Sequence, residues 1–69
     1  MLWIVLKRES HQIIACNIAK KGDEFELWVT RPNDKGLCIA KSEKLEDVQV
    51  IKEAIDFAIE QGEKALRIA

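Results

Sequence analysis

The side chains that could do chemistry in this 69-residue chain are few and widely separated. The one histidine, His11, lies in a polar stretch, and the two cysteines, Cys16 and Cys38, each lie alone within apolar runs. Cys16 and His11 could form a nucleophile pair across a hairpin, but a histidine in a turn is more often a solvated polar residue. These soft ligands also lack the paired spacing of a zinc site. We therefore expect no catalytic residue, no cofactor and no metal.

The acidic residues near the C-terminal end form a second candidate cluster. They are Glu53, Asp56, Glu60 and Glu63. The solvated side of a helix accounts for this set without any acid–base or metal chemistry. The three glycines are isolated from one another, so the sequence contains no phosphate-binding loop. The chain is not expected to be an enzyme.

The acidic residues belong to one long periodic segment, residues 45–61, which predicts a helix. Ser42 is the expected N-cap, because its hydroxyl can accept from free N–H groups of the first turn. The predicted core stripe contains Val48, Ile51, Ile55, Ala58, Ile59 and Gly62. A weaker row on nearly the opposite side contains Val50, Ala54, Phe57 and Gln61.

One sheet cannot cover both rows of this helix. The second row is therefore either a set of stray exposed apolar residues or a contact stripe for a second subunit or partner helix. A phenylalanine aligned with valine and alanine on an otherwise charged side favours the contact stripe.

The residues before the helix predict short strands separated by turns. The predicted strands are Leu2–Arg8, Ile13–Ala19, Phe25–Arg31 and Leu37–Ala40. Short links predict a four-stranded antiparallel β-meander followed by one long C-terminal helix, a ββββα order in a single α+β domain spanning residues 1–69. After Gly62, a natural C′ residue, the chain either adds a short fifth strand or extends the helix.

Alternation along the strands divides the predicted sheet into two faces. The helix side is expected to hold Leu2, Ile4, Leu6, Ile14, Cys16, Ile18, Phe25, Leu27 and Val29. The opposite side is expected to hold Trp3, Val5, Ile13, Ala15 and Trp28. A tryptophan can bury roughly 150–250 Å², so two of them facing water suggest that something covers this face.

Three occupants of that face are consistent with the sequence: a second copy in a homodimer, another protein, or single-stranded nucleic acid. Nucleic-acid bases would stack on the aromatic rings, and basic side chains would contact the phosphates. The basic residues for this role are Lys7, Arg8, Lys20, Lys21 and Arg31.

Composition limits the class of partner and compartment. Eleven Lys plus Arg against twelve Asp plus Glu give a net charge of −1, which excludes the strongly basic class typical of duplex DNA binders. Hydrophobic residues make up 48%, more than one sheet and one helix readily hide, which favours self-association. Leu2–Leu6 is too short an apolar run for a signal peptide, and no segment is long enough to cross a membrane. Two isolated cysteines fit reduced thiols in the cytoplasm.

The sequence therefore predicts a small non-catalytic binding module, a homodimeric protein–protein interaction or regulatory and inhibitory protein. The partner-binding residues would be Trp3, Val5 and Trp28 on the sheet and Val50, Ala54 and Phe57 on the helix. The alternative is a single-stranded nucleic-acid-binding protein that uses its aromatic sheet face.

Overall fold

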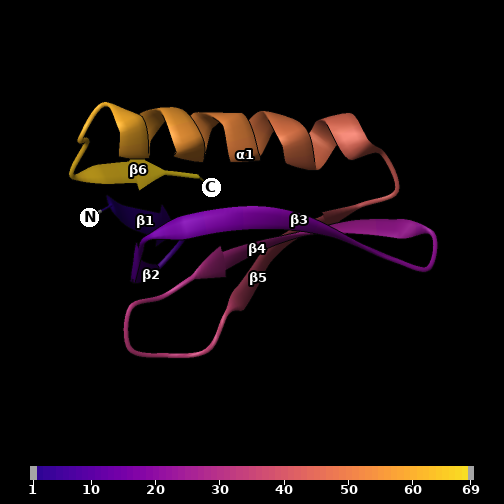
Figure 1. Cartoon of the computed structure of the whole chain (residues 1–69), viewed down its shortest axis with the longest axis horizontal. Coiled ribbons are helices and arrows are strands. Elements are labelled where there is room, and N and C mark those ends of the chain that lie inside the picture. The colour runs from indigo at the N-terminus through magenta and orange to yellow at the C-terminus, as the bar shows by residue number, and fades with distance from the viewer. Residues whose placement is uncertain (1, 69) are drawn as a thin grey trace.

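The computed structural model describes residues 2–68, so Ala69, the end of the expected tail, lies outside the described residues. The elements are β1 (Leu2–Leu6), β2 (Glu9–Ile13), β3 (Ala15–Lys21), β4 (Glu24–Thr30), β5 (Leu37–Ser42), α1 (Leu45–Glu60) and β6 (Ala65–Arg67). Figure 1 shows α1 as a layer of its own, with the strands all on one side of it. The predicted α+β class is confirmed.

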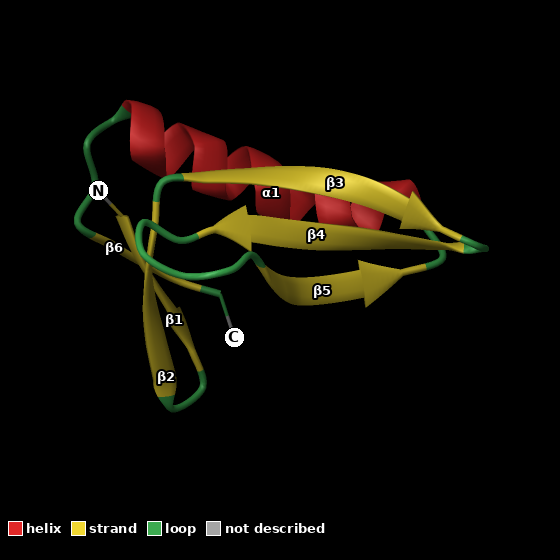
Figure 2. Cartoon of the chain, turned by 60° about the horizontal axis from the view of Figure 1, so that its bottom comes forward, coloured by secondary structure: helices red, strands yellow, loops and turns green. Residues whose placement is uncertain are grey.

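The strands form two three-stranded sheets, so the prediction of a single four-stranded meander is wrong. One sheet has the order β2-β1-β6, and the other has the order β3-β4-β5. The second sheet is an antiparallel meander, whereas β1 pairs antiparallel with β2 and parallel with β6. In Figure 2 the β1–β2 hairpin points away from the second sheet.

The two sheets separate at Ile14, inside the predicted strand Ile13–Ala19. Ile14 lies in neither β2 nor β3, and its N–H donates to the Thr30 carbonyl at 2.9 Å. This corner residue changes the alternation: Ile13 is fully buried, Ile14 is 47% exposed, and Cys16 packs against the core. The placement of Ile13 on the open face and Ile14 on the helix face was therefore wrong.

Residues 9–12 lie between the first two predicted strands, Leu2–Arg8 and Ile13–Ala19, and were expected to connect them; instead they belong to strand β2. A tight turn at Lys7 and Arg8 brings Glu9 opposite Leu6. Lys7 adopts a φ of 51°, in the left-handed region that disfavours side chains with a Cβ. The polar residues that resembled a loop are thus held as a strand by pairing with the apolar β1.

Helix α1 is confirmed to within one residue of the predicted range. The prediction of Ser42 as the N-cap is wrong, because the N-cap position is Lys44, two residues later. The Ser42 hydroxyl accepts from the Lys44 N–H at 3.0 Å and donates to Asp47 Oδ2 at 2.6 Å. At the other end Gly62, with a φ of 71°, is the C′ residue of a Schellman motif, in which the Glu63 N–H donates to the Ala58 carbonyl at 2.9 Å.

Beyond Gly62 the chain forms strand β6 rather than a helical extension. The Trp3 N–H donates to the Lys64 carbonyl at 2.9 Å, and the Ile68 N–H donates to the Val5 carbonyl at 3.0 Å. The C-terminal segment therefore joins the first strand of the chain, and the long helix is not the last element.

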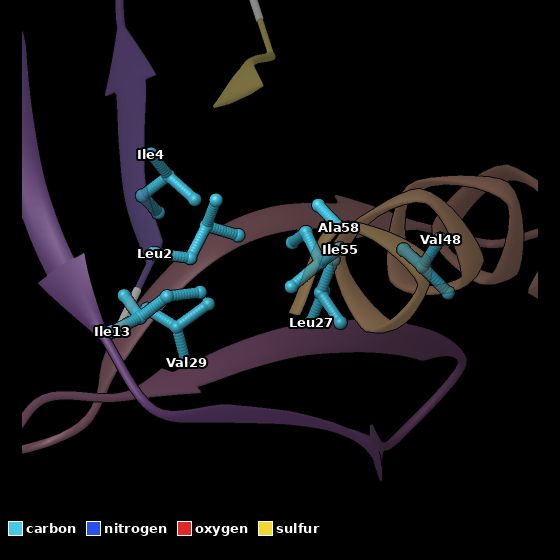
Figure 3. Packing of buried hydrophobic residues seen from close by; sticks show 8 residues of the cluster. All are labelled: Leu2, Ile4, Ile13, Leu27, Val29, Val48, Ile55 and Ala58. Carbon is cyan, nitrogen blue, oxygen red and sulfur yellow. The ribbon is translucent and has the colours of Figure 1, made fainter. Parts of the chain in front are cut away.

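The core joins both sheets to α1, as Figure 3 shows. Its buried apolar residues are Leu2, Ile4, Ile13, Leu27, Val29, Val48, Ile55 and Ala58. The predicted inner stripe of the helix is confirmed at Val48, Ile55 and Ala58, and Ile51 and Ile59 pack against its edge. Burying an aliphatic side chain of this size stabilises the fold by about 1.5–3 kcal/mol.

Candidate functional site

The most exposed large apolar side chains lie on the side of α1 that faces away from the strands. Val50 is 65% exposed and Phe57 is 62% exposed, and Ala54 between them is also exposed. We call Val50, Ala54 and Phe57 the outer row. Because the inner stripe of the same helix is already packed on both sheets, nothing within the described chain covers the outer row.

Acidic side chains surround the outer row. Helix α1 carries Glu46, Asp47, Glu53, Asp56 and Glu60 against one basic residue, Lys52, a balance of 1 − 5 = −4. The five acidic residues are all exposed. The Lys52 ammonium donates to Asp56 Oδ2, and this hydrogen bond is the main cause of a lowered Asp56 pKa. The outer row is therefore an apolar stripe in a negative surface.

Trp3 provides a second exposed apolar surface, on the first sheet. Its side chain is 46% exposed, and its neighbours across the strands are Gln12 and Ala65. Val5, on the same face, is half-buried between Ser10 and Arg67. The large apolar side chains of this surface are less exposed than Val50 and Phe57 of the outer row.

Trp28 lies on the other sheet and has partners within the chain. Its Nε1–H donates to Glu26 Oε1 at 3.1 Å, and Lys41 Nζ lies 3.6 Å from Glu26 Oε2. Glu26 is only 7% exposed, and a Cβ at Gly36 would lie 3.5 Å from Cε3 of the Trp28 ring. Because Trp3 and Trp28 belong to different sheets, the expected common aromatic face is not formed.

The basic residues predicted to contact phosphates do not gather on one surface. Lys7 and Arg8 form the β1–β2 turn, whereas Lys20 and Lys21 end β3, and Figure 2 shows these two hairpin tips far apart in the molecule. Lys20 Nζ lies 5.7 Å from the centre of the Phe25 ring.

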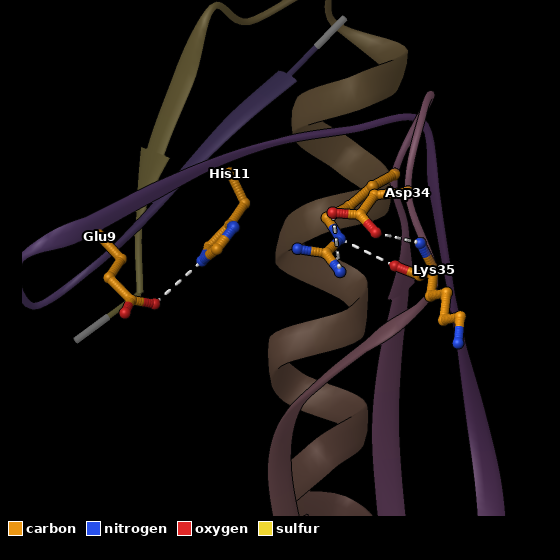
Figure 4. A network of polar contacts seen from close by, with 5 residues as sticks. Glu9, His11, Asp34 and Lys35 are labelled. Carbon is orange, nitrogen blue, oxygen red and sulfur yellow. Dashed lines mark hydrogen bonds and ion pairs between the residues drawn. The ribbon is translucent and has the colours of Figure 1, made fainter.

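Arg31, the fifth residue predicted to contact phosphates, instead contacts residues of the loop that follows it. Its Nε–H donates to the Lys35 carbonyl at 2.8 Å, and its terminal nitrogen lies 3.5 Å from Asp34 Oδ2. Figure 4 shows this loop network beside the separate contact of His11 with Glu9. Arg31 is therefore positioned to order the β4–β5 loop.

His11 and Cys16 do not form a nucleophile pair. His11 lies in β2 opposite Ile4 rather than in a turn, and its Nε2 is 3.1 Å from Glu9 Oε2. The Cys16 thiol instead donates to Asp56 Oδ1 at 3.3 Å. Burial, followed by this hydrogen bond, raises the pKa of Cys16 to about 12, so the thiolate that a nucleophile requires is suppressed.

The two cysteines are free and lie on opposite faces of the second sheet. Cys16 pairs with Val29 on the core face, and Cys38 pairs with Trp28 on the outer face. Within residues 2–68 no group of three or more histidine, cysteine or acidic side chains is arranged to hold a metal ion. The one helix in this range is too short and too polar to cross a membrane.

Two grooves were not anticipated from the sequence. The larger has a volume of about 440 Å³ and is lined by Leu6, Lys7, Arg8, Glu9 and Ile39. The smaller, about 240 Å³, is lined by Leu2, Ile13, Ile14, Ile59, Gly62 and Glu63. Both lie where the first sheet meets other elements, so their formation depends on the division into two sheets that the sequence pattern did not show.

Comparison of the chain with protein-family models, with curated proteins and with solved structures yields no match.

Proposed function

We propose that this chain is a small non-catalytic protein-interaction module that binds its partner through the outer row of α1. The observation that carries the proposal is the exposure of Val50 and Phe57, 65% and 62%, on a helix whose other side already supplies the core. Exposed apolar patches rimmed by polar residues are typical of protein interaction sites. The two free thiols are consistent with function in the cytoplasm, where cysteines stay reduced.

The outer row is a better candidate than either tryptophan. Trp28 is half-buried against its own chain, and Trp3, at 46%, is less exposed than Val50 or Phe57. The alternative function, binding of single-stranded nucleic acid, loses support because its basic residues lie on separate hairpins and Arg31 is engaged within its loop. Self-association through Trp3 is the remaining route to the expected homodimer.

Site-specific photo-crosslinking tests this proposal in cells that naturally produce the protein. A benzophenone amino acid would replace Phe57 in one variant and Gln49 in a matched control, because both positions are exposed on the same helix and only Phe57 belongs to the outer row. We expect a discrete protein adduct from position 57, no such adduct from position 49, and loss of the adduct when Val50→Asp is added.

One further measurement, of secondary structure, completes the design. Circular dichroism should show that each variant keeps its helix, so that a lost adduct reports lost docking. Equal adducts from positions 57 and 49, or an adduct that survives Val50→Asp, would contradict docking through the outer row. An adduct that contains only a second copy of the chain would replace the partner protein with a homodimer.

A further inference from the structure

The outer row has the spacing of a helix–helix seam. Its residues Val50, Ala54 and Phe57, followed by Gln61 at the C-cap of α1, are separated by four, three and four residues, which is the alternation of the a and d positions in a coiled coil. Val50 and Phe57 then occupy d positions, and Ala54 and Gln61 occupy a positions. The small Ala54 side chain allows a second backbone to approach closely. The 16 residues of α1 are enough for about two heptads.

The same register places three acidic residues at equivalent positions beside the seam. Glu46, Glu53 and Glu60 are spaced by seven residues, and each precedes an a position, so all are g residues. Charges at e and g positions select the partner and its orientation in helix pairs. All three carboxylates are exposed, and none is in an ion pair with another described side chain.

A second copy of α1 does not complement this row of carboxylates. In an antiparallel pair the g residues of one helix face the g residues of the other, which would oppose glutamates to glutamates. In a parallel pair they face the e positions, which are Ile51 and Ala58, both packed on the core. The helix's one basic residue, Lys52, is bonded to Asp56. Like charges in close opposition destabilise such contacts.

We propose that the partner docked on α1 is an amphipathic helix of another protein, with an apolar a/d seam and lysine or arginine beside it. This proposal rests on the docking function of the outer row and adds the chemistry of the occupant. The partner's apolar side chains pack on Val50 and Phe57 across Ala54, and its basic side chains pair with Glu46, Glu53 and Glu60.

Two synthetic helical peptides test this partner chemistry. They share one apolar 4-3 seam and a fluorescent label, and they carry lysine in one case and glutamate in the other at the flanking positions. Fluorescence anisotropy with the full chain should show that the lysine peptide binds at least about tenfold more tightly at low salt, because complementary charges select partners. Raising the salt concentration should shrink this difference, since exposed charges are screened.

Charge-reversed variants separate the flanking charges from the seam. Glu53→Lys combined with Glu60→Lys should shift the preference towards the glutamate peptide. The matched control, Asp23→Lys with Glu24→Lys, makes the same change in net charge on exposed residues at the distant β3–β4 turn and should leave the preference unchanged. Phe57→Asp should abolish binding of both peptides.

The outcomes distinguish the two proposals. If Phe57→Asp abolishes binding but reversal of the glutamates leaves the peptide preference unchanged, the basic-helix partner is overturned and docking through the outer row stands. If neither peptide binds the wild-type chain, the helical partner is again overturned, while crosslinking from position 57 still decides whether the surface docks a protein. If both control and test variants shift the preference equally, net charge rather than the row of glutamates selects the peptide, and the proposal fails.

Discussion

The inner and outer sides of α1 carry similar apolar side chains, but those on the inner side are buried and those on the outer side are exposed. On the inner side, Val48 and Ile55 are at most 1% exposed and contact both sheets through the core, whereas on the outer side Val50 and Phe57 are more than half exposed. Burial on one side already fixes the helix to the sheets. The outer side chains therefore add little to the packing within the chain, and they leave an apolar surface free for the proposed docking.

The two tryptophans repeat this contrast on the sheets. Trp28 is supported by a buried carboxylate and by the loop at Gly36, whereas the Trp3 ring is 46% exposed. Substitution of a side chain that packs or bonds within the chain should lower the stability of the fold. Substitution of an exposed apolar side chain should leave stability unchanged and weaken binding.

The largest effect on folding is expected from Ile55→Ala, because Ile55 is fully buried between α1 and the sheets. The cavity should lower the free energy of unfolding by about 2–5 kcal/mol, measured by urea denaturation followed by circular dichroism. If this variant does not fold, Ile55→Val should still lower it by about 0.5–1.5 kcal/mol. An unchanged midpoint for Ile55→Val would show that the inner side does not hold the core together.

A smaller loss is expected from Glu26→Ala, which removes the acceptor of the Trp28 Nε1–H and the partner of Lys41. A polar group left without its partner costs about 1–3 kcal/mol where it is buried, and Trp28 is half-buried. Tryptophan emission in a Trp3→Phe background should also shift to the red. Glu24→Ala, at an exposed position on the same strand, is the control and should change stability by no more than about 0.5 kcal/mol.

The helix was predictable because its determinants are local in the sequence. The 3.6-residue period of its apolar residues placed α1 to within one residue of its observed end, and it separated the inner stripe from the outer row. Gly62 also acted as the expected C′ residue. The candidate surface on the helix therefore came from the sequence, although its partner did not.

The sheets were less predictable because their pairing depends on distant contacts. Residues 13–19 contain no glycine or proline, and side chains at alternate positions could face opposite sides of one strand. The sequence around Ile14 therefore gives no sign that the chain leaves the first sheet there. The parallel pairing of β6 with β1 joins the two ends of the chain, and no local pattern specifies it. The burial of Trp28 within its own sheet was also not predicted. It depends on Gly36, which lies beside the ring, and on Lys41, which pairs with Glu26, and both residues come after the strand that carries Trp28.

The contact between α1 and β3 should give a pH-dependent stability. The pKa of Cys16 is raised from 9.0 to about 12, so above pH 9 the unfolded chain releases this proton while the folded chain keeps it. Stability that is present below pH 9 should therefore fall as the pH rises towards 12. The raised pKa of Lys52 acts in the same direction. Thermal melts should show a steeper alkaline decline for the wild type than for Cys16→Val, with Cys38→Val as the control; identical slopes would contradict the role of Cys16.

The smallest effect on folding is expected from Phe57→Ser, although it removes one of the largest apolar side chains of the helix. Phe57 is 62% exposed and belongs to no part of the core, so its loss should change the free energy of unfolding by no more than about 0.5 kcal/mol. Urea denaturation beside Ile55→Val provides the measurement. A loss comparable to that of Ile55→Val would mean that Phe57 is already buried in the purified protein, for example by a second copy of the chain. A midpoint that depends on protein concentration would reveal such a dimer. An unchanged midpoint together with lost peptide binding would show that the inner side of α1 stabilises the fold and that the outer side binds the partner.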